Sequence, residues 1–186
     1  MLLPDPLGPD EQDWLPWLAA RLREADREVR LASWPAPAAA DLDGCLAALR
    51  QGLAGLPDDG FDVLAHSTAC LLWLHHASQG AEGSPRPARV ALVAPPAADA
   101  PLPAWDFLRP VPLAVDALRR AADGTVLVGG EDDPHCPGGV AQVYGAPLKM
   151  AATVIAGGGA LTAASGFGPW PAVLDWCGRD NLAFRA

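Results

Sequence analysis

The sequence predicts an α/β fold, with a mostly parallel sheet of about five to six strands and helices on both faces. Two observations predict it. Stretches with apolar residues at helical spacing alternate with short runs of strand type along the 186 residues. Several of these short runs are apolar throughout, which is typical of strands covered on both faces. The length suits one domain, residues 1–186, with a single core.

The first half of the chain alternates helices with strands. Apolar residues spaced three and four apart predict helices over 14–23 and 42–53. Between them, residues 28–32 alternate polar with apolar side chains, as a half-exposed strand does. Residues 61–65 form a short strand-like run, and a helix is expected over 68–79.

The second half supplies the remaining strands and a lid. Apolar runs at 90–93 and 125–128 predict buried strands, and residues 153–155 resemble them. Residues 94–112 are rich in proline and alanine and too irregular for a sheet element, so we expect a minimal lid or pocket wall there. Its large apolar side chains are candidates for substrate contacts: Trp105, Phe107 and Leu108.

Composition excludes several partners. The 13 basic and 22 acidic residues give a net charge of −9, and Lys149 is the only lysine, so nucleic acid is not an expected partner. No stretch reaches the ~18 apolar residues of a membrane span, and the N-terminus lacks signal-peptide features. We therefore expect a cytoplasmic protein without a cofactor, acting on a small molecule, with a homodimer left open. The four cysteines are isolated, which indicates reduced, buried thiols.

A serine lies between a predicted strand and a predicted helix. Ser67 has Ala65 and Ala69 two residues to either side, in the pattern of the Gly-x-Ser-x-Gly nucleophile elbow, where a tight turn admits only small flanking residues. A serine that only caps the helix is the alternative.

Three segments carry a resemblance to a known family. Residues 65–69 read Ala-His-Ser-Thr-Ala, residues 131–137 read Glu-Asp-Asp-Pro-His-Cys-Pro, and residues 157–171 read Gly-Gly-Gly-Ala-Leu-Thr-Ala-Ala-Ser-Gly-Phe-Gly-Pro-Trp-Pro. They resemble the small α/β hydrolases of the retinoblastoma-binding serine hydrolase, or YdeN-like, family. The corresponding family patterns are Ala-His-Ser-x-Gly, Asp-Asp-Pro-Tyr and Gly-Gly-His-Leu-Asn-Ala-x-Ser-Gly-Phe-Gly-x-Trp-Pro. The resemblance implies an α/β-hydrolase fold, with Ser67 as nucleophile, Asp133 as triad acid and the Thr68 N–H as an oxyanion donor.

The same resemblance implies that the Ser-His-Asp triad is dismantled. The family's catalytic histidine aligns with Ala160, whose methyl group accepts no proton. The family's first loop reads Pro-Gly-Trp-x-x-Ser-Gly-x-x-His-Trp, and its ends match Pro4 and Trp14. Between these ends, four functional positions of the family hold other residues: Asp5 for glycine, Pro6 for the oxyanion donor, Pro9 for serine and Asp13 for histidine. The first loop and the loop of Ala160 thus both hold residues that disfavour the transition state of ester hydrolysis. One engineered substitution would not produce both changes, so natural divergence is favoured over a deliberately introduced Ala160.

Other residues are candidates for the missing base. His135 lies two residues beyond Asp133 and is the best of them, with a solvated loop residue as the alternative. We expect His66 to point away from Ser67, and two further histidines to be surface or packing residues: His75 and His76. No metal is expected; the one conceivable ligand set is Glu131, Asp132, Asp133 and His135.

Three functions remain. The first is a repurposed small-molecule enzyme for cyclisation, elimination or isomerisation, with natural-product biosynthesis as one setting. Its expected substrate contacts are Asp5, Asp13, Trp105, Phe107, Leu108 and Trp170, beside Ser67, Asp133 and His135 as catalytic groups. The second is a serine hydrolase or esterase in which Ala160 is an introduced substitution or is compensated by His135. The third is a ligand-binding protein without catalysis.

Overall fold

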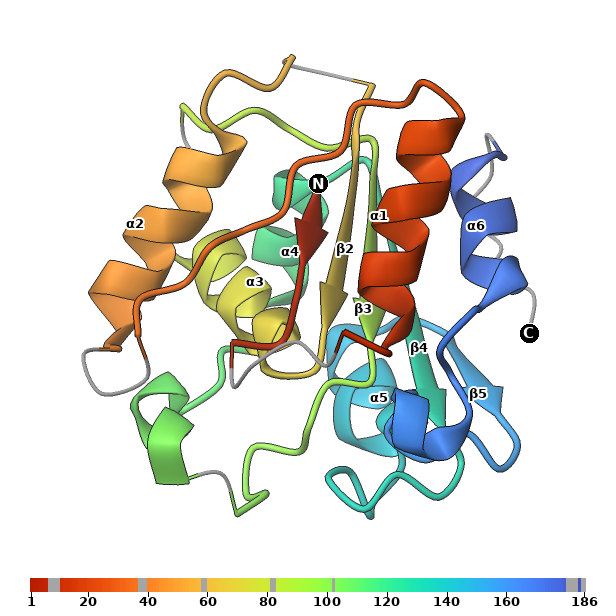
Figure 1. Ribbon diagram of the computed structural model, residues 1–186. Coiled ribbons are helices and arrows are strands. Elements are labelled where there is room, and N and C mark those ends of the chain that lie inside the picture. The colour runs from red at the N-terminus through yellow and green to blue at the C-terminus, as the bar shows by residue number, and fades with distance from the viewer. Residues whose placement is uncertain are drawn as a thin grey trace.

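Five parallel strands form one sheet in the order β1-β2-β3-β4-β5 (Figure 1). The computed structural model describes residues 1–6, 11–36, 40–57, 60–80, 83–101, 103–179 and 184. The strands are β1 (Leu2–Leu3), β2 (Asp62–His66), β3 (Arg89–Val93), β4 (Gly124–Gly130) and β5 (Ala152–Ile155). The sequence-based strands at 61–65, 90–93, 125–128 and 153–155 are confirmed, with ends that differ by one or two residues.

The strand predicted over 28–32 is wrong as a full strand. This segment makes one isolated parallel bridge, between Leu31 and Leu2, on the free side of β1. Two backbone hydrogen bonds flank the bridge: Leu2 N–H to Arg30 O and Ala32 N–H to Leu2 O. Because β1 has only two residues, no longer ladder forms.

The bridge still sets the topology of the sheet. The chain enters at β1, crosses to residues 28–32 on one side, and then returns to β2 on the other side. The direction of strand succession therefore reverses between β1 and β2. In open parallel sheets, ligands bind outside the carboxyl ends of the strands at this kind of switch point. The loops after β1 and β2 are thus expected to carry the site.

Helices cover both faces of the sheet (Figure 1). On one face lie α1 (Trp14–Glu24) and α6 (Pro171–Cys177), which pack against Leu64 and Val93. On the other face lie α2 (Leu42–Leu53), α3 (Thr68–Ser78) and α4 (Val115–Ala121), which pack against Val63 and Leu92. Successive strand residues alternate between these two cores, as the pleat of a strand requires.

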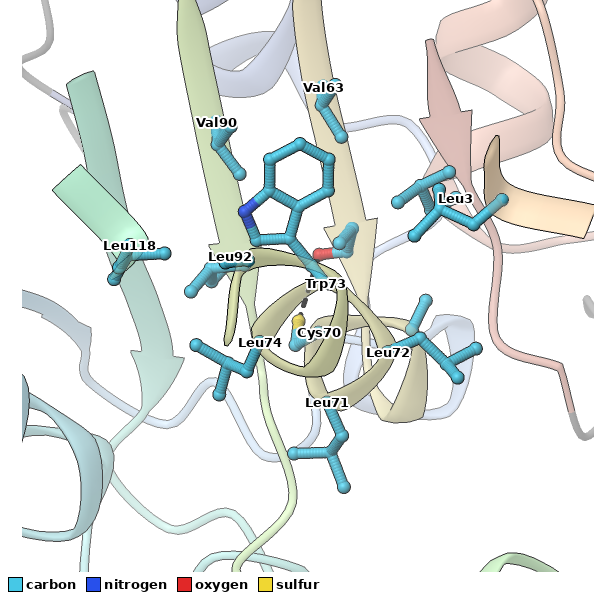
Figure 2. Packing of buried hydrophobic residues seen from close by; sticks show 14 of the residues in the cluster. Leu3, Val63, Cys70, Leu71, Leu72, Trp73, Leu74, Val90, Leu92 and Leu118 are labelled. Carbon is cyan, nitrogen blue, oxygen red and sulfur yellow. Dashed lines mark hydrogen bonds between the residues drawn. The ribbon is translucent and has the colours of Figure 1, made fainter. Parts of the chain in front are cut away.

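The helix α3 is buried along its whole length except at its end. Figure 2 shows Trp73 lying across the sheet between Val63 and Val90, with Leu72 and Leu74 on either side of the helix. A helix that is apolar all round needs neighbours on all sides. It is the central helix of its layer, with α2 and α4 as neighbours.

The helices expected at 14–23, 42–53 and 68–79 are confirmed, but several shorter ones were not predicted. They are α4, α6, the π-helix Ala141–Gly145, α5 (Ala146–Leu148), and the 3₁₀ helices Pro103–Leu108 and Ala163–Ser165. Each has at most seven residues, so its apolar spacing covers too few turns to stand out.

One ion pair fastens the amino ends of the strands. Arg89, at the start of β3, makes a two-point contact with the Asp62 carboxylate and donates to the carbonyls of Trp176 and Arg179. Its guanidinium also lies 4.3 Å from the centroid of the Trp176 ring. The side chains of Arg89 and Asp62 are mostly buried, at 12% and 16% exposure. The contact joins β2, β3 and the end of α6.

We expect Arg89→Met to lower the free energy of unfolding by about 3 kcal/mol, because it leaves the Asp62 carboxylate and two carbonyls without their donor. Arg21→Met is the matched control, because its pair with Glu24 is at least half exposed and is expected to contribute less than about 0.5 kcal/mol. Denaturant unfolding of both variants measures the difference. Equal losses in the two variants would contradict this account.

Candidate active site

Ser67 occupies a strained turn between β2 and α3. Its φ of 55° and ψ of −127° lie in a region that residues other than glycine rarely adopt. The turn is held by two backbone hydrogen bonds, from Ser67 N–H to Val93 O and from Cys70 N–H to Ser67 O. Backbone strain of this kind is characteristic of the nucleophile elbow.

The residues flanking the turn are fully enclosed. Ala65 and Ala69, two residues before and after Ser67, are both completely buried. The Cys70 thiol donates to the carbonyls of Ala65 and Val93, and burial raises its pKa. These contacts agree with the small residues that the sequence requires here. Ser67 itself keeps partial exposure at the carboxyl edge of the sheet.

Asp133 lies in the loop that follows β4 and is almost fully buried, at 4% exposure. Its Oδ1 accepts a hydrogen bond from the His135 backbone N–H at 2.8 Å. Burial raises the pKa of Asp133, and the opposing effects of the His135 N–H and ring and of the His66 ring are smaller. The carboxyl group therefore holds its proton to a higher pH than an ordinary aspartate.

The loop carrying Ala160 lies directly on the end of β4. A Cβ on Gly130 would come within 2.1 Å of the Gly159 carbonyl, and one on Gly158 within 3.0 Å of the Gly130 Cα. Only glycines permit this approach. The loop that carries Asp133 and the loop that carries Ala160 are therefore in backbone contact.

Three side chains from three different segments hold the loop that carries Ala160. Asp132 Oδ1 accepts from Gly159 N–H at 2.8 Å, and Asp13 Oδ1 accepts from Ala163 N–H at 2.6 Å. The Nε2 atom of His66 lies 3.2 Å from the Ala160 carbonyl oxygen. We refer to Asp13, His66 and Asp132 as the loop clamp. Sequence reasoning gave His66 no role and named Asp132 only as a metal ligand, because no local pattern reveals contacts between such distant segments.

His66 is a buried, neutral histidine inside an acidic surrounding. Burial lowers its pKa, while the Ala160 carbonyl and the charges of Asp5, Asp13 and Asp133 act in the opposite direction. A carbonyl oxygen only accepts hydrogen bonds, so Nε2 carries the ring proton. The ring also packs edge-on against Trp14, with centroids 5.3 Å apart. Its hydrogen bond and this packing leave it directed at the clamped loop.

Asp5 lies beside the first turn of α3. Its Oδ1 accepts a hydrogen bond from the hydroxyl of the fully buried Thr68 at 2.9 Å. A carboxylate thus lies next to the residue whose N–H was expected to stabilise an oxyanion. Pro6, which has no N–H, follows it. Pro9, which takes the position of the family's serine, lies outside the described residues.

None of the chain's four histidines forms a hydrogen bond with Ser67. His66 is engaged by Ala160, and His75 Nε2 contacts the Leu108 carbonyl at 2.7 Å. His76 is buried beside Trp73, where burial lowers its pKa to about 4, so it has the packing role expected of it. His135 is exposed, and only its backbone N–H bonds to Asp133.

The large apolar side chains proposed as substrate contacts are mostly core residues. Trp105 and Leu108 are buried in the layer of α3, at 2% and 0% exposure, and Phe107 is half buried beside Trp105. Trp170 belongs to the other core, where its ring meets those of Trp14, Phe167 and Phe184. Their part in binding a substrate stays a prediction.

The described residues contain no group of three or more side chains placed to hold a metal ion. The set Glu131, Asp132, Asp133 and His135 is thus not gathered as ligands, since Asp132 bonds the clamped loop and Asp133 bonds the His135 backbone. Nor does any described helix have the length and apolar character needed to cross a membrane.

The wrapped parallel sheet, the serine in a strained turn after β2 and the buried aspartate after β4 define an α/β hydrolase. The serine hydrolase family model matches residues 2–178, and the chain belongs to this family.

Two solved structures share the fold. The ydeN gene product of B. subtilis is 19% identical, with a TM-score of 0.73 over 94% of this chain and 93% of that one. A protein of Pectobacterium atrosepticum described as a YdeN-like hydrolase is 25% identical, with a TM-score of 0.65 over 95% of this chain and 86% of its own. No protein in the curated set matches the chain.

We expect Asp132→Ala to loosen residues 157–163, because Gly159 N–H loses its acceptor. The cost is about 1 kcal/mol of local stability, which corresponds to roughly fivefold faster amide exchange in this loop. Glu131→Ala is the matched control, since Glu131 is the exposed acidic neighbour. Hydrogen–deuterium exchange with peptide resolution measures both variants. Unchanged exchange in Asp132→Ala would show that the clamp does not hold the loop.

Asp133→Asn is expected to raise the free energy of unfolding at pH 7 by about 1 kcal/mol. The amide keeps an acceptor for the His135 N–H and removes a charge that burial disfavours. Since burial raises the folded-state pKa, the stability linked to protonated Asp133 is fully present below the unfolded pKa of about 4. It is lost as pH rises through the folded pKa. The advantage of the variant is therefore largest near neutrality and disappears below about pH 4.

Thermal unfolding between pH 3 and 8 tests this dependence, with Glu131→Gln at the exposed neighbouring acid as control. If Asp133→Asn were less stable than the natural chain at pH 7, this prediction would be contradicted.

Proposed function

We propose that this member of the serine hydrolase family is a small-molecule enzyme that works without an acyl-enzyme, by acid–base chemistry at Asp133. The observation that carries the proposal is the placement of the histidines. Each of the four is either packed against other groups or exposed, and none forms a hydrogen bond with Ser67. A serine hydroxyl without a base is a poor nucleophile at neutral pH.

The surroundings of the elbow also disfavour an oxyanion. The Asp5 carboxylate accepts a hydrogen bond from the Thr68 hydroxyl at the first turn of α3. A tetrahedral intermediate formed at Ser67 would place its negative charge at this turn. A carboxylate at that point repels the developing charge. The loss of one oxyanion donor alone costs on the order of 10² to 10³ in rate, and removal of a triad member costs several orders of magnitude more.

Asp133 has the properties of a single acid–base group. It is buried, its pKa is raised by that burial, and it faces the same end of the sheet as Ser67. A carboxyl group with a raised pKa is more effective in proton transfer near neutrality. Elimination, cyclisation and isomerisation need a shaped site and one such group. Ser67 then binds the substrate through its hydroxyl, and the exposed His135 contributes at the rim.

A conventional hydrolase is the second candidate, and one observation favours it. Ser67 keeps the strained elbow geometry, which a purely structural serine has no need to retain. The related protein of Pectobacterium atrosepticum is described as a hydrolase. In this alternative His135 moves inward to serve as the base.

A fluorophosphonate probe separates the two candidates, because it labels only an activated serine. We expect labelling of the natural chain no faster than that of Ser67→Ala, at least 10³-fold below an ordinary serine hydrolase. Ala160→His is expected to stay near this background, because Asp5 and Pro6 remain. Rapid labelling of the natural chain at Ser67, lost in His135→Ala, would overturn the proposal and establish the hydrolase.

A further inference from the structure

A cavity lies at the opposite end of the sheet from Ser67, at the amino ends of the strands. Its volume is about 220 Å³. Its walls come from β1, the end of α1, the segment 28–30 and the start of β2, and include Leu22, Arg27, Val29, Arg30, Phe61 and Asp62. We call it the amino-end cavity. It is smaller than the ~300 Å³ of ordinary drug-sized pockets, so its ligand is small.

The short β1 explains why the cavity exists. β2 has five residues, but only Leu64 and Ala65 pair with β1. On the other side of β1, residues 28–32 make their single bridge at Leu31. Towards the amino end, no strand of the described residues therefore lies between residues 28–30 and the start of β2. Side chains from the two segments line the resulting opening.

The charged side chains of the cavity leave one donor available, and the N-terminal ammonium of Met1 donates to the Asp62 carbonyl. Arg30 is occupied by Glu28 and by the carbonyls of Ala54 and Gly55. Asp62 is held by Arg89. The guanidinium of Arg27 makes no hydrogen bond and no ion pair with any residue in the described part of the chain, and it lines both this cavity and the adjoining groove. The two carboxylates that line the cavity, those of Glu28 and Asp62, are paired with other arginines, so an anion entering it meets a cation that is not already in an ion pair.

Apolar side chains also line the cavity. Leu22, Val29 and Phe61 line the cavity and are half buried, so each keeps apolar surface that a ligand would cover. The fully buried Leu2 and Leu64 line it as well. Covering such surface favours binding. The cavity thus pairs one free cation with a small apolar surface.

We propose that the amino-end cavity binds a small amphipathic anion, with its acid group on Arg27 and its apolar body against Leu22, Val29 and Phe61. The ligand class is a carboxylate or sulfonate carried by a ring or a short hydrocarbon chain. The site is separate from Asp133, and it does not depend on the reaction proposed there.

The test compares two probes that differ in charge, 2-naphthoate and 2-naphthalenemethanol, by ligand-observed NMR titration of the full chain. We expect naphthoate to bind saturably, and Arg27→Gln to weaken it about fivefold. Arg23→Gln is the matched control, because Arg23 is an exposed arginine near the end of α1, four residues before Arg27, and does not line the cavity. It makes the same change in net charge and should alter naphthoate affinity less than twofold. The uncharged alcohol should not respond to Arg27→Gln.

A second variant tests the apolar wall. Val29→Phe fills part of the cavity, so both probes should lose affinity while the thermal unfolding temperature stays within a few degrees. Failure of naphthoate to bind the natural chain at millimolar concentration would overturn the proposal. So would equal binding by Arg27→Gln, or equal weakening by Arg23→Gln.

Discussion

The backbone contact between Gly130 and the Gly158–Gly159 turn is the constraint on which the rest of the candidate active site depends. It brings the loop after β4 against the loop after β5, and any side chain at Gly130 would prevent it. The loops that carry Asp133 and Ala160 are held against one another for this reason. The hydrogen bond from Gly159 to Asp132 then fixes the register between the two loops.

Much of the architecture could be predicted from the sequence, because it follows from patterns within single segments. Apolar spacing located α1, α2 and α3, and apolar runs located β2 to β5. The short helices and the true state of residues 28–32 could not be predicted in this way. How far that segment pairs is decided by the neighbouring strand β1, which has only two residues, and not by the segment's own sequence.

In the candidate site, the features formed by a single segment could be predicted from the sequence. The contacts between distant segments could not. The turn at Ser67 and the loop of Asp133 carry recognisable sequences, and the structure places both at the carboxyl end of the sheet. The contact of His66 with Ala160 joins residues 94 positions apart, and no spacing rule reports it. Likewise, the packing of the Trp170 ring among aromatic neighbours in the core could not be read from the sequence, and its suggested role as a ligand contact stays a prediction. Burial of that kind is decided by tertiary packing.

The outer borders of the sheet have a consequence for behaviour in concentrated solution. One border is formed by the single bridge at Leu31 and the other by the four residues of β5, where Val154 is 46% exposed. Long, flat, apolar borders recruit strands from other molecules and lead to aggregation. Here each border is too short to template such growth, so the exposed Leu31 and Val154 are tolerated. Lengthening β5 with further apolar residues would remove this protection.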